Sequence, residues 1–108
     1  MAVLIPQFLS SRQVQHLRGL AHALEPVVLV GKEGVTEACT RQVDETIVRH
    51  ELIKVRLPAV DRTQRKDMAT ALSAGVPAHL VAALGRIVIL YRRHPEKPRV
   101  ELPKNPRA

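Results

Sequence analysis

The chain has 108 residues, enough for one domain with a single hydrophobic core and too few to divide into two. Its 17 lysines and arginines outnumber 10 acidic residues, so the formal net charge is +7 and a polyanionic partner, nucleic acid first, is favoured. A membrane surface is the rival polyanion, but the only aromatic residues, Phe8 and Tyr91, provide no anchors for a basic amphipathic helix. The single Cys39 excludes an internal disulfide and fits a reducing compartment, and the N-terminus lacks a secretion signal, so we expect a cytoplasmic protein.

The first half of the sequence predicts a helix, a strand and a second helix. Ser10 or Ser11 caps a run of apolar residues at helical spacing that ends near Leu24. The apolar run "VVLV" at 27–30 does not alternate, which favours a central strand buried on both faces. A second apolar stripe predicts a helix over about 36–50, capped by its first residue, a threonine.

The second half predicts one more strand, a third helix and a closing hairpin. "LIKVRL" at 52–57 alternates, so Lys54 and Arg56 share one partly basic face. A helix follows over about 61–75, and the runs "HLVAAL" and "IVILYR" form a hairpin around Gly85, whose position favours a type II′ turn. A strand, a helix and another strand imply parallel pairing through a right-handed crossover, and the hairpin adds an antiparallel pair.

The C-terminal sequence from Arg92, "RRHPEKPRVELPKNPRA", is rich in proline and positive charge. Such a segment is expected to bury little and to form an extended or mobile tail. We therefore expect a domain at 1–94 and a basic tail at 95–108, with no second domain and no internal repeat.

The loop "GKEG" joins the predicted strand to the second helix, where backbone N–H groups are unpaired and the helix dipole favours negative charge. Gly31 and Gly34 permit positive φ and let a sugar-phosphate backbone approach without meeting a Cβ, while Lys32 adds charge and Glu33 points outward. The competing interpretation is a tight turn that needs two glycines for conformation alone. The four residues by themselves do not decide between these interpretations.

Other chemistries lack the residues they need. The sequence contains no P-loop motif and no third glycine for a dinucleotide fingerprint, and "HELIK" has lysine where a zinc protease needs its second histidine. The histidines are scattered, so we expect no metal and no cofactor. Cys39 lies on an apolar stripe and is expected to be inert, and the adjacent His50 and Glu51 diverge in direction, so we do not expect an enzyme.

The segments "LRGLAHALEPVVLVGKEGVTE", "HELIKVRL", "LVAALGRIVILYRR" and "VELP", in this order over about 9–103, resemble the CRM domain (chloroplast RNA splicing and ribosome maturation) in its bacterial single-domain, YhbY-like form. The resemblance implies an α/β fold of about three helices and a mixed four-stranded sheet in the order α-β-α-β-α-β-β, similar to the C-terminal domain of translation initiation factor three. It also implies RNA binding without catalysis, association with precursors of the large ribosomal subunit, and RNA contact by a GxxG loop, as in KH domains. That loop maps onto Gly31, Lys32, Glu33 and Gly34, of which Glu33 is less typical and is expected to limit affinity.

We expect further basic residues to extend the RNA footprint beyond the loop, although each could equally be ordinary solvated charge. These candidates are Arg18, His22, Lys54, Arg56, Arg86 and Arg92. Because aromatic residues for base stacking are almost absent, recognition should depend on backbone charge and RNA shape. Two alternatives stay open: a module that docks an acidic ribosomal or partner protein, and an RNA-modifying or RNA-cleaving enzyme, for which the sequence offers no titratable cluster. A monomer is the default.

Overall fold

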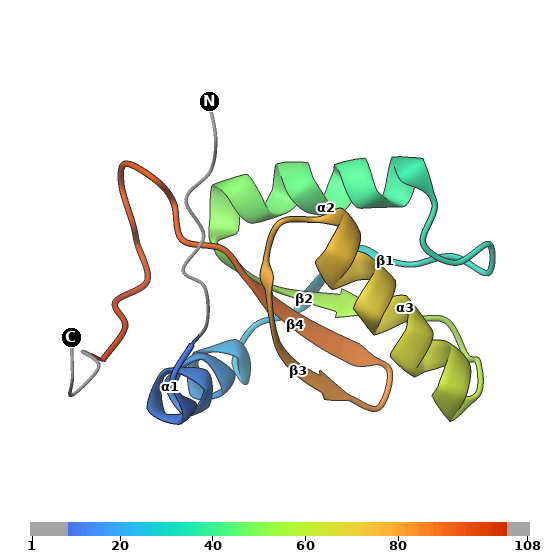
Figure 1. Cartoon of the computed structure of the whole chain (residues 1–108), viewed down its shortest axis with the longest axis horizontal. Helices are drawn as coiled ribbons and strands as arrows, with labels where there is room; N and C mark the ends of the chain where they lie inside the picture. Colours follow the sequence, from blue (N-terminus) through green and yellow to red (C-terminus); the bar gives the residue numbers. More distant parts are fainter. Residues whose placement is uncertain (1–8, 104–108) are drawn as a thin grey trace.

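The computed structural model describes residues 9–103 (Figure 1), and these form three helices and four strands around one sheet. The elements are α1 (Ser11–Ala21), β1 (Pro26–Leu29), α2 (Glu37–His50), β2 (Leu52–Arg56), α3 (Arg62–Gly75), β3 (His79–Leu84) and β4 (Ile87–Tyr91). The strand order is β1-β2-β4-β3, with β1 parallel to β2 and the other pairs antiparallel. The expected mixed four-stranded sheet and element order are confirmed.

Each helix begins at a cap that the local sequence specifies. Ser10 before α1 and Asp61 before α3 each accept a hydrogen bond from the backbone of the glutamine three residues on, whose side chain accepts one back. Thr36 accepts from the backbone N–H of Cys39 before α2, as expected. The helix starts therefore follow from the local sequence.

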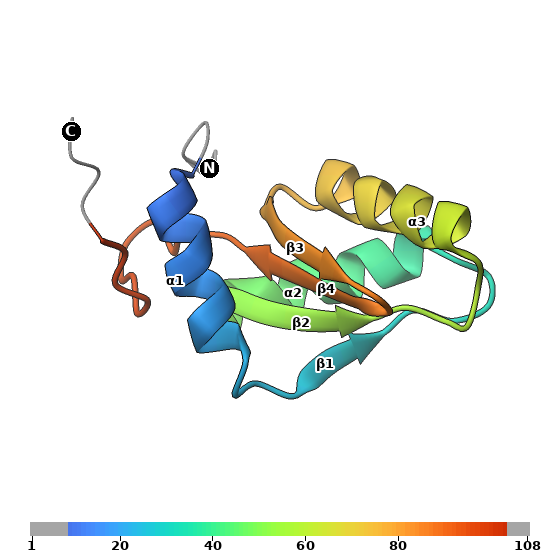
Figure 2. The ribbon, with the colours of Figure 1, turned by 90° about the horizontal axis from the view of Figure 1, so that it is seen from below.

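The sheet separates two hydrophobic cores (Figure 2). Helices α2 and α3 cover one face, over a larger cluster that includes Val43, Ile47, Ile53, Val55 and Leu72. Helix α1 covers part of the other face, over a smaller cluster formed by Leu17, Ala21, Leu52, Val81, Ile89 and Tyr91. The predicted alternation of β2 is confirmed, because its odd positions from 53 belong to the larger cluster while Leu52 belongs to the smaller one.

Strand β1 corrects the expectation of a central strand buried on both faces. It lies at the edge of the sheet, next to β2 only. Val28 and Val30 are buried, but the two residues that alternate with them are not: Val27 is 46% exposed and Leu29 is 68% exposed. Burial of this second face of β1 depends on how far α1 extends over the sheet, and the four apolar residues at 27–30 do not specify that distance.

Helix α1 is shorter than expected, since it ends at Ala21 and not near Leu24. The side chains of Leu20 and Leu24 are substantially exposed. The Lys54 ammonium lies beyond its last turn, donating to the carbonyl oxygens of His22 (3.3 Å) and Leu24 (3.0 Å). A cation at this position satisfies orphan carbonyls and complements the negative end of the helix dipole. One of the expected RNA contacts thus also stabilises the end of a helix.

The closing hairpin is confirmed: Leu84 of β3 pairs with Ile87 of β4 across a two-residue loop. Gly85 has φ +60°, whereas Arg86 has no positive φ. A type II′ turn requires this combination, because only its first central residue is left-handed.

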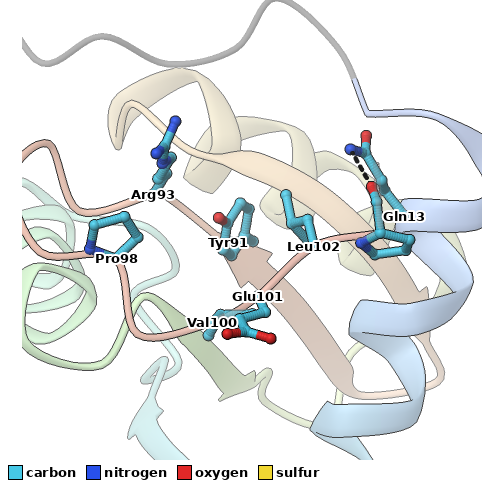
Figure 3. A pocket seen from close by; sticks show the side chains of 8 residues that line it. Gln13, Tyr91, Arg93, Pro98, Val100, Glu101 and Leu102 are labelled. Carbon is cyan, nitrogen blue, oxygen red and sulfur yellow. Dashed lines mark hydrogen bonds between the residues drawn. The ribbon is translucent and has the colours of Figure 1, made fainter. Parts of the chain in front are cut away.

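The segment after β4 has no regular secondary structure, and its residues 95–99 are exposed, while its last described residues pack against the domain (Figure 3). Val100 and Leu102 are half-buried against the cluster beneath α1, and the Gln13 side chain donates to the Pro103 carbonyl (3.1 Å). The backbone N–H of Arg99 donates to a carboxylate oxygen of the buried Glu51. The expected boundary at 94/95 stays a prediction, and the rest of the predicted tail, 104–108, lies outside the described residues.

His79 on β3 provides a test of the packing beneath α1. Its ring stacks on Tyr91 with centroids 6.3 Å apart, and burial lowers its pKa from 6.5 because the charged form loses solvation. The unfolded chain then binds the proton more readily than the folded one. Stability should therefore fall as the pH drops below about 6.5, by at most about 1.4 kcal/mol per pH unit, until the folded-state pKa is passed.

Urea unfolding between about pH 7.5 and pH 5 would measure this dependence in the wild type and in His79→Phe, which keeps the stacked ring. The variant should show the shallower decline over this range. Parallel curves for the two proteins would contradict the assignment to His79.

Candidate nucleic-acid interface

The glycine loop (Gly31–Gly34) is a turn closed by a hydrogen bond from the Gly34 N–H to the Gly31 carbonyl (3.0 Å). Only its second glycine uses left-handed backbone, since Gly34 has φ +84° while Gly31 has no positive φ. The interpretation that both glycines serve the turn is therefore wrong for Gly31. Its missing side chain needs another explanation.

The surroundings of Gly31 supply one. A Cβ added there would lie 2.5 Å from Glu33 Oε2, which is the movable end of an exposed side chain. Neither the backbone nor a fixed neighbour therefore demands glycine at this position, and its bare Cα leaves the main chain open to a close approach. The Glu33 carboxylate folds back over Gly31 instead of pointing outward, so the acid stands next to the expected phosphate site.

The glycine loop ends two residues before the N-cap of α2, whereas the sequence predicts that it lies at the start of this helix. Helix α2 begins at Glu37, after Thr36 has used its side chain as the cap, and Glu37 already places an acid in the first turn. On the other side the loop touches α3, because a Cβ on Gly34 would lie 3.7 Å from Met68 Cε. Anion binding at the loop must therefore depend on its own amides and on the exposed Lys32 more than on the helix dipole.

Three of the expected basic residues meet in one place. Arg18, His22 and Lys54 line a hollow of about 400 Å³ between α1 and the sheet, which we call the α1 hollow. Its remaining lining is Gly19, Leu84, Ile87 and Ile89. Arg18 comes from α1, His22 is the C-cap of that helix and Lys54 comes from β2, and the sheet supplies the apolar floor.

Arg56 is the last residue of β2 and Arg86 lies in the turn between β3 and β4. Figure 2 shows the ends of β1 and β2 and this turn at the same end of the sheet. Arg56 is exposed and in register with Leu29 of β1 and Ile87 of β4. Arg86 is exposed too, and its Nε donates to the Leu57 carbonyl (3.0 Å), which ties the hairpin to the end of β2. Both arginines keep an accessible positive charge beside the loop.

Arg92 is the exception, and the expectation that it offers a free cation is corrected. Its side chain is only 5% exposed, and one guanidinium nitrogen lies 2.7 Å from a carboxylate oxygen of Asp44. The same nitrogen donates to the Pro77 carbonyl (3.3 Å). Arg92 follows β4, at the opposite end of that strand from the hairpin. Its arrangement is that of a structural ion pair.

Sequence reasoning missed a further basic group on α3. Arg62, Arg65 and Lys66 occupy the first half of this helix and line a second hollow beside β3. The signal was present in "DRTQRK", because cations near a helix N-terminus oppose the dipole and call for a reason other than helix stability.

The described part of the chain provides little for catalysis. Within residues 9–103 no group of three or more His, Cys, Asp or Glu side chains could hold a metal ion. Burial raises the pKa of the Cys39 thiol, although the Thr36 contact works against this, so the thiol stays protonated and a weak nucleophile. No described helix is both long and apolar enough to cross a bilayer.

Comparison with known proteins shows the family to which the chain belongs. The model of the CRS1/YhbY (CRM) domain matches residues 9–92. A Haemophilus influenzae protein named as RNA-binding is 38% identical over 96 residues, covering 89% of this chain and 96% of that protein. A Bacillus subtilis protein named as a probable RNA-binding protein is 36% identical over 95 residues, covering 88% and 99%. The solution structure of a Staphylococcus aureus protein, proposed in its description to bind RNA, matches with a TM-score of 0.78 and 34% identity, covering 89% and 100%.

Proposed function

This chain belongs to the CRS1/YhbY (CRM) domain family, and from that membership we propose that it binds RNA, associates with precursors of the large ribosomal subunit and assists their assembly. The observation that carries the proposal is Gly31, an exposed glycine that its turn does not require, next to the exposed Lys32. A bare Cα beside a free ammonium suits close approach by a sugar-phosphate backbone.

The proposed contact starts at the glycine loop. Its amides and Lys32 hold one or two phosphates, and Glu33 moves aside when RNA approaches Gly31. Arg86 in the hairpin turn and Arg56 at the end of β2 continue the basic track along the end of the sheet. The footprint finishes in the α1 hollow, where the apolar floor can take a sugar or base edge between cations.

The affinity should fall steeply with salt, because the cations of this track release counterions from the RNA. Four or five neutralised phosphates predict a log–log slope on the order of −3 for single-stranded RNA. Fluorescence anisotropy of a labelled fragment of large-subunit ribosomal RNA, titrated over a series of salt concentrations, measures it. A flat titration would contradict binding through phosphate contacts.

Sedimentation of the tagged chain in cell lysate tests the assembly role. The wild type should enter the fractions that hold large-subunit precursors, and RNase treatment should release it. An association that survives RNase would favour the competing function, a module that docks an acidic ribosomal or partner protein. Absence from those fractions in a correctly folded protein would contradict the assembly role while leaving RNA binding to the salt titration.

A further inference from the structure

A second hollow lies on the face of the sheet opposite the α1 hollow, between α3 and β3. We call it the α3–β3 groove. Its volume is about 440 Å³, and its floor is apolar, formed by Leu57, Ala69, Leu80 and Ala83. The apolar side chain of Leu80 is 41% exposed in the described part of the chain. None of the expected RNA contacts lines this groove.

One wall of the groove is an unguarded sheet edge. Strand β3 is the outermost strand and pairs only with β4 in the described part of the chain. Edge strands are commonly protected by lysine, proline or short length, yet β3 has six residues, "HLVAAL", with none of these residue types. Its one protective device is the irregularity between Leu80 and Ala82. The outer backbone groups of the remaining residues can pair with another extended chain.

The other wall is positive. Arg62, Arg65 and Lys66 line it from the first half of α3. None of them forms an ion pair within residues 9–103, and the first turn of the helix contains no acid. The N-cap carboxylate of Asp61 already occupies the positive end of the helix dipole, so the positive charge of this wall comes from the three side chains. This wall attracts an anion.

We propose that the α3–β3 groove binds an acidic, extended peptide segment of another protein, which adds as a fifth strand along β3. Main-chain hydrogen bonds to the edge would supply affinity. The side chains at every second position of the added strand face the groove, and these would be both apolar, over Leu80 and Ala83, and acidic, toward the α3 cations. The unpaired backbone edge of β3 beside the groove favours an extended peptide over RNA, because a peptide can extend a sheet by main-chain hydrogen bonds and RNA cannot. A second copy of this chain is disfavoured because both copies would bring the same cations together. The inference is independent of the proposed RNA function.

A synthetic peptide of about ten residues with threonine at every second position, and valine and glutamate in turn at the positions between, is a suitable probe, because its valines and glutamates then share one face. Its saturable binding should slow amide hydrogen exchange along β3 and leave that of β1, the other edge, unchanged. The same peptide N-methylated at alternate residues should fail to bind, because it cannot pair with the edge. The same peptide with lysine in place of each glutamate should also fail, because the α3 cations repel it.

The double variant Arg65→Glu with Lys66→Glu should weaken peptide binding about tenfold or more, a difference of about 1.4 kcal/mol for each factor of ten. Arg41→Glu with Arg49→Glu on α2 is the matched control, since it makes the same change of net charge at exposed positions outside the groove and should bind normally. Lack of slowed exchange on β3 at millimolar peptide would overturn the proposal. So would displacement of the peptide by oligouridylate, which would assign the groove to RNA, or protection of β3 through self-association without peptide.

Discussion

Combining Gly31→Asp with Lys32→Ala is expected to lower the affinity for RNA about tenfold or more while leaving the melting temperature unchanged. The aspartate places a Cβ and a negative charge where the backbone is proposed to approach, and the alanine removes the phosphate-binding ammonium. Folding should tolerate both changes, because Gly31 has no positive φ and both residues are exposed. Fluorescence anisotropy with a fragment of large-subunit ribosomal RNA gives the affinity, and circular dichroism gives the melting temperature.

Two controls sharpen this prediction. Arg49→Ala removes an exposed cation at the far end of α2 and should leave the affinity unchanged. Glu33→Gln removes the acid that folds over Gly31 and should raise the affinity a few-fold, since a like charge beside a phosphate opposes binding. If the double variant binds as tightly as the wild type, the loop is only a turn, and the track from Arg86 to the α1 hollow carries the binding.

Arg92→Met should lower the free energy of unfolding by about 2 to 3 kcal/mol. The methionine fills a similar volume but cannot replace the ion pair with Asp44 or the hydrogen bond to the Pro77 carbonyl. The cost stays below that of a fully buried pair because the Asp44 side chain is 46% exposed and can be solvated by water. Urea unfolding measures the difference.

Measuring the RNA affinity of Arg92→Met distinguishes the structural role of Arg92 from the RNA contact that the sequence predicts for it. In folded Arg92→Met, the salt slope of RNA affinity should equal that of the wild type, because the guanidinium is buried and its hydrogen bonds are made within the domain. A slope reduced by about one unit would instead show that Arg92 neutralises a phosphate. Asp44→Asn tests the pair from its other side and should destabilise less, since it keeps a side-chain oxygen that can accept from Arg92.

The sequence predicts the parts of this fold whose causes are local. Thr36 and Asp61 cap their helices through residues three positions on, and Gly85 sets its turn through its own φ. Exposure of β1 was missed because it depends on how far α1 reaches across the sheet. The role of Arg92 was missed for a similar reason, since its partner Asp44 lies 48 residues earlier in the chain.

In the candidate site, too, the sequence predicts the local features but not those that depend on distant residues. The resemblance brought out the glycine loop, but only its geometry separates the turn glycine, Gly34, from Gly31, whose absent side chain the turn does not need. The basic flank of α1 and the partly basic face of β2 were each visible as patterns. The sequence did not predict that these residues meet in the α1 hollow, because no local pattern specifies which helix covers which face of the sheet.

The position of β4 dictates when this domain can fold during synthesis. β4 is the last strand to be made, yet it lies inside the sheet, between β2 and β3. Helix α1, the first element made, packs against these late strands and against Val100 and Leu102. A nascent chain that has reached the end of α3 therefore lacks both the central pairing of its sheet and the floor beneath its first helix. The α1 hollow assembles only once translation has passed β4, so a partly synthesised chain does not yet display it.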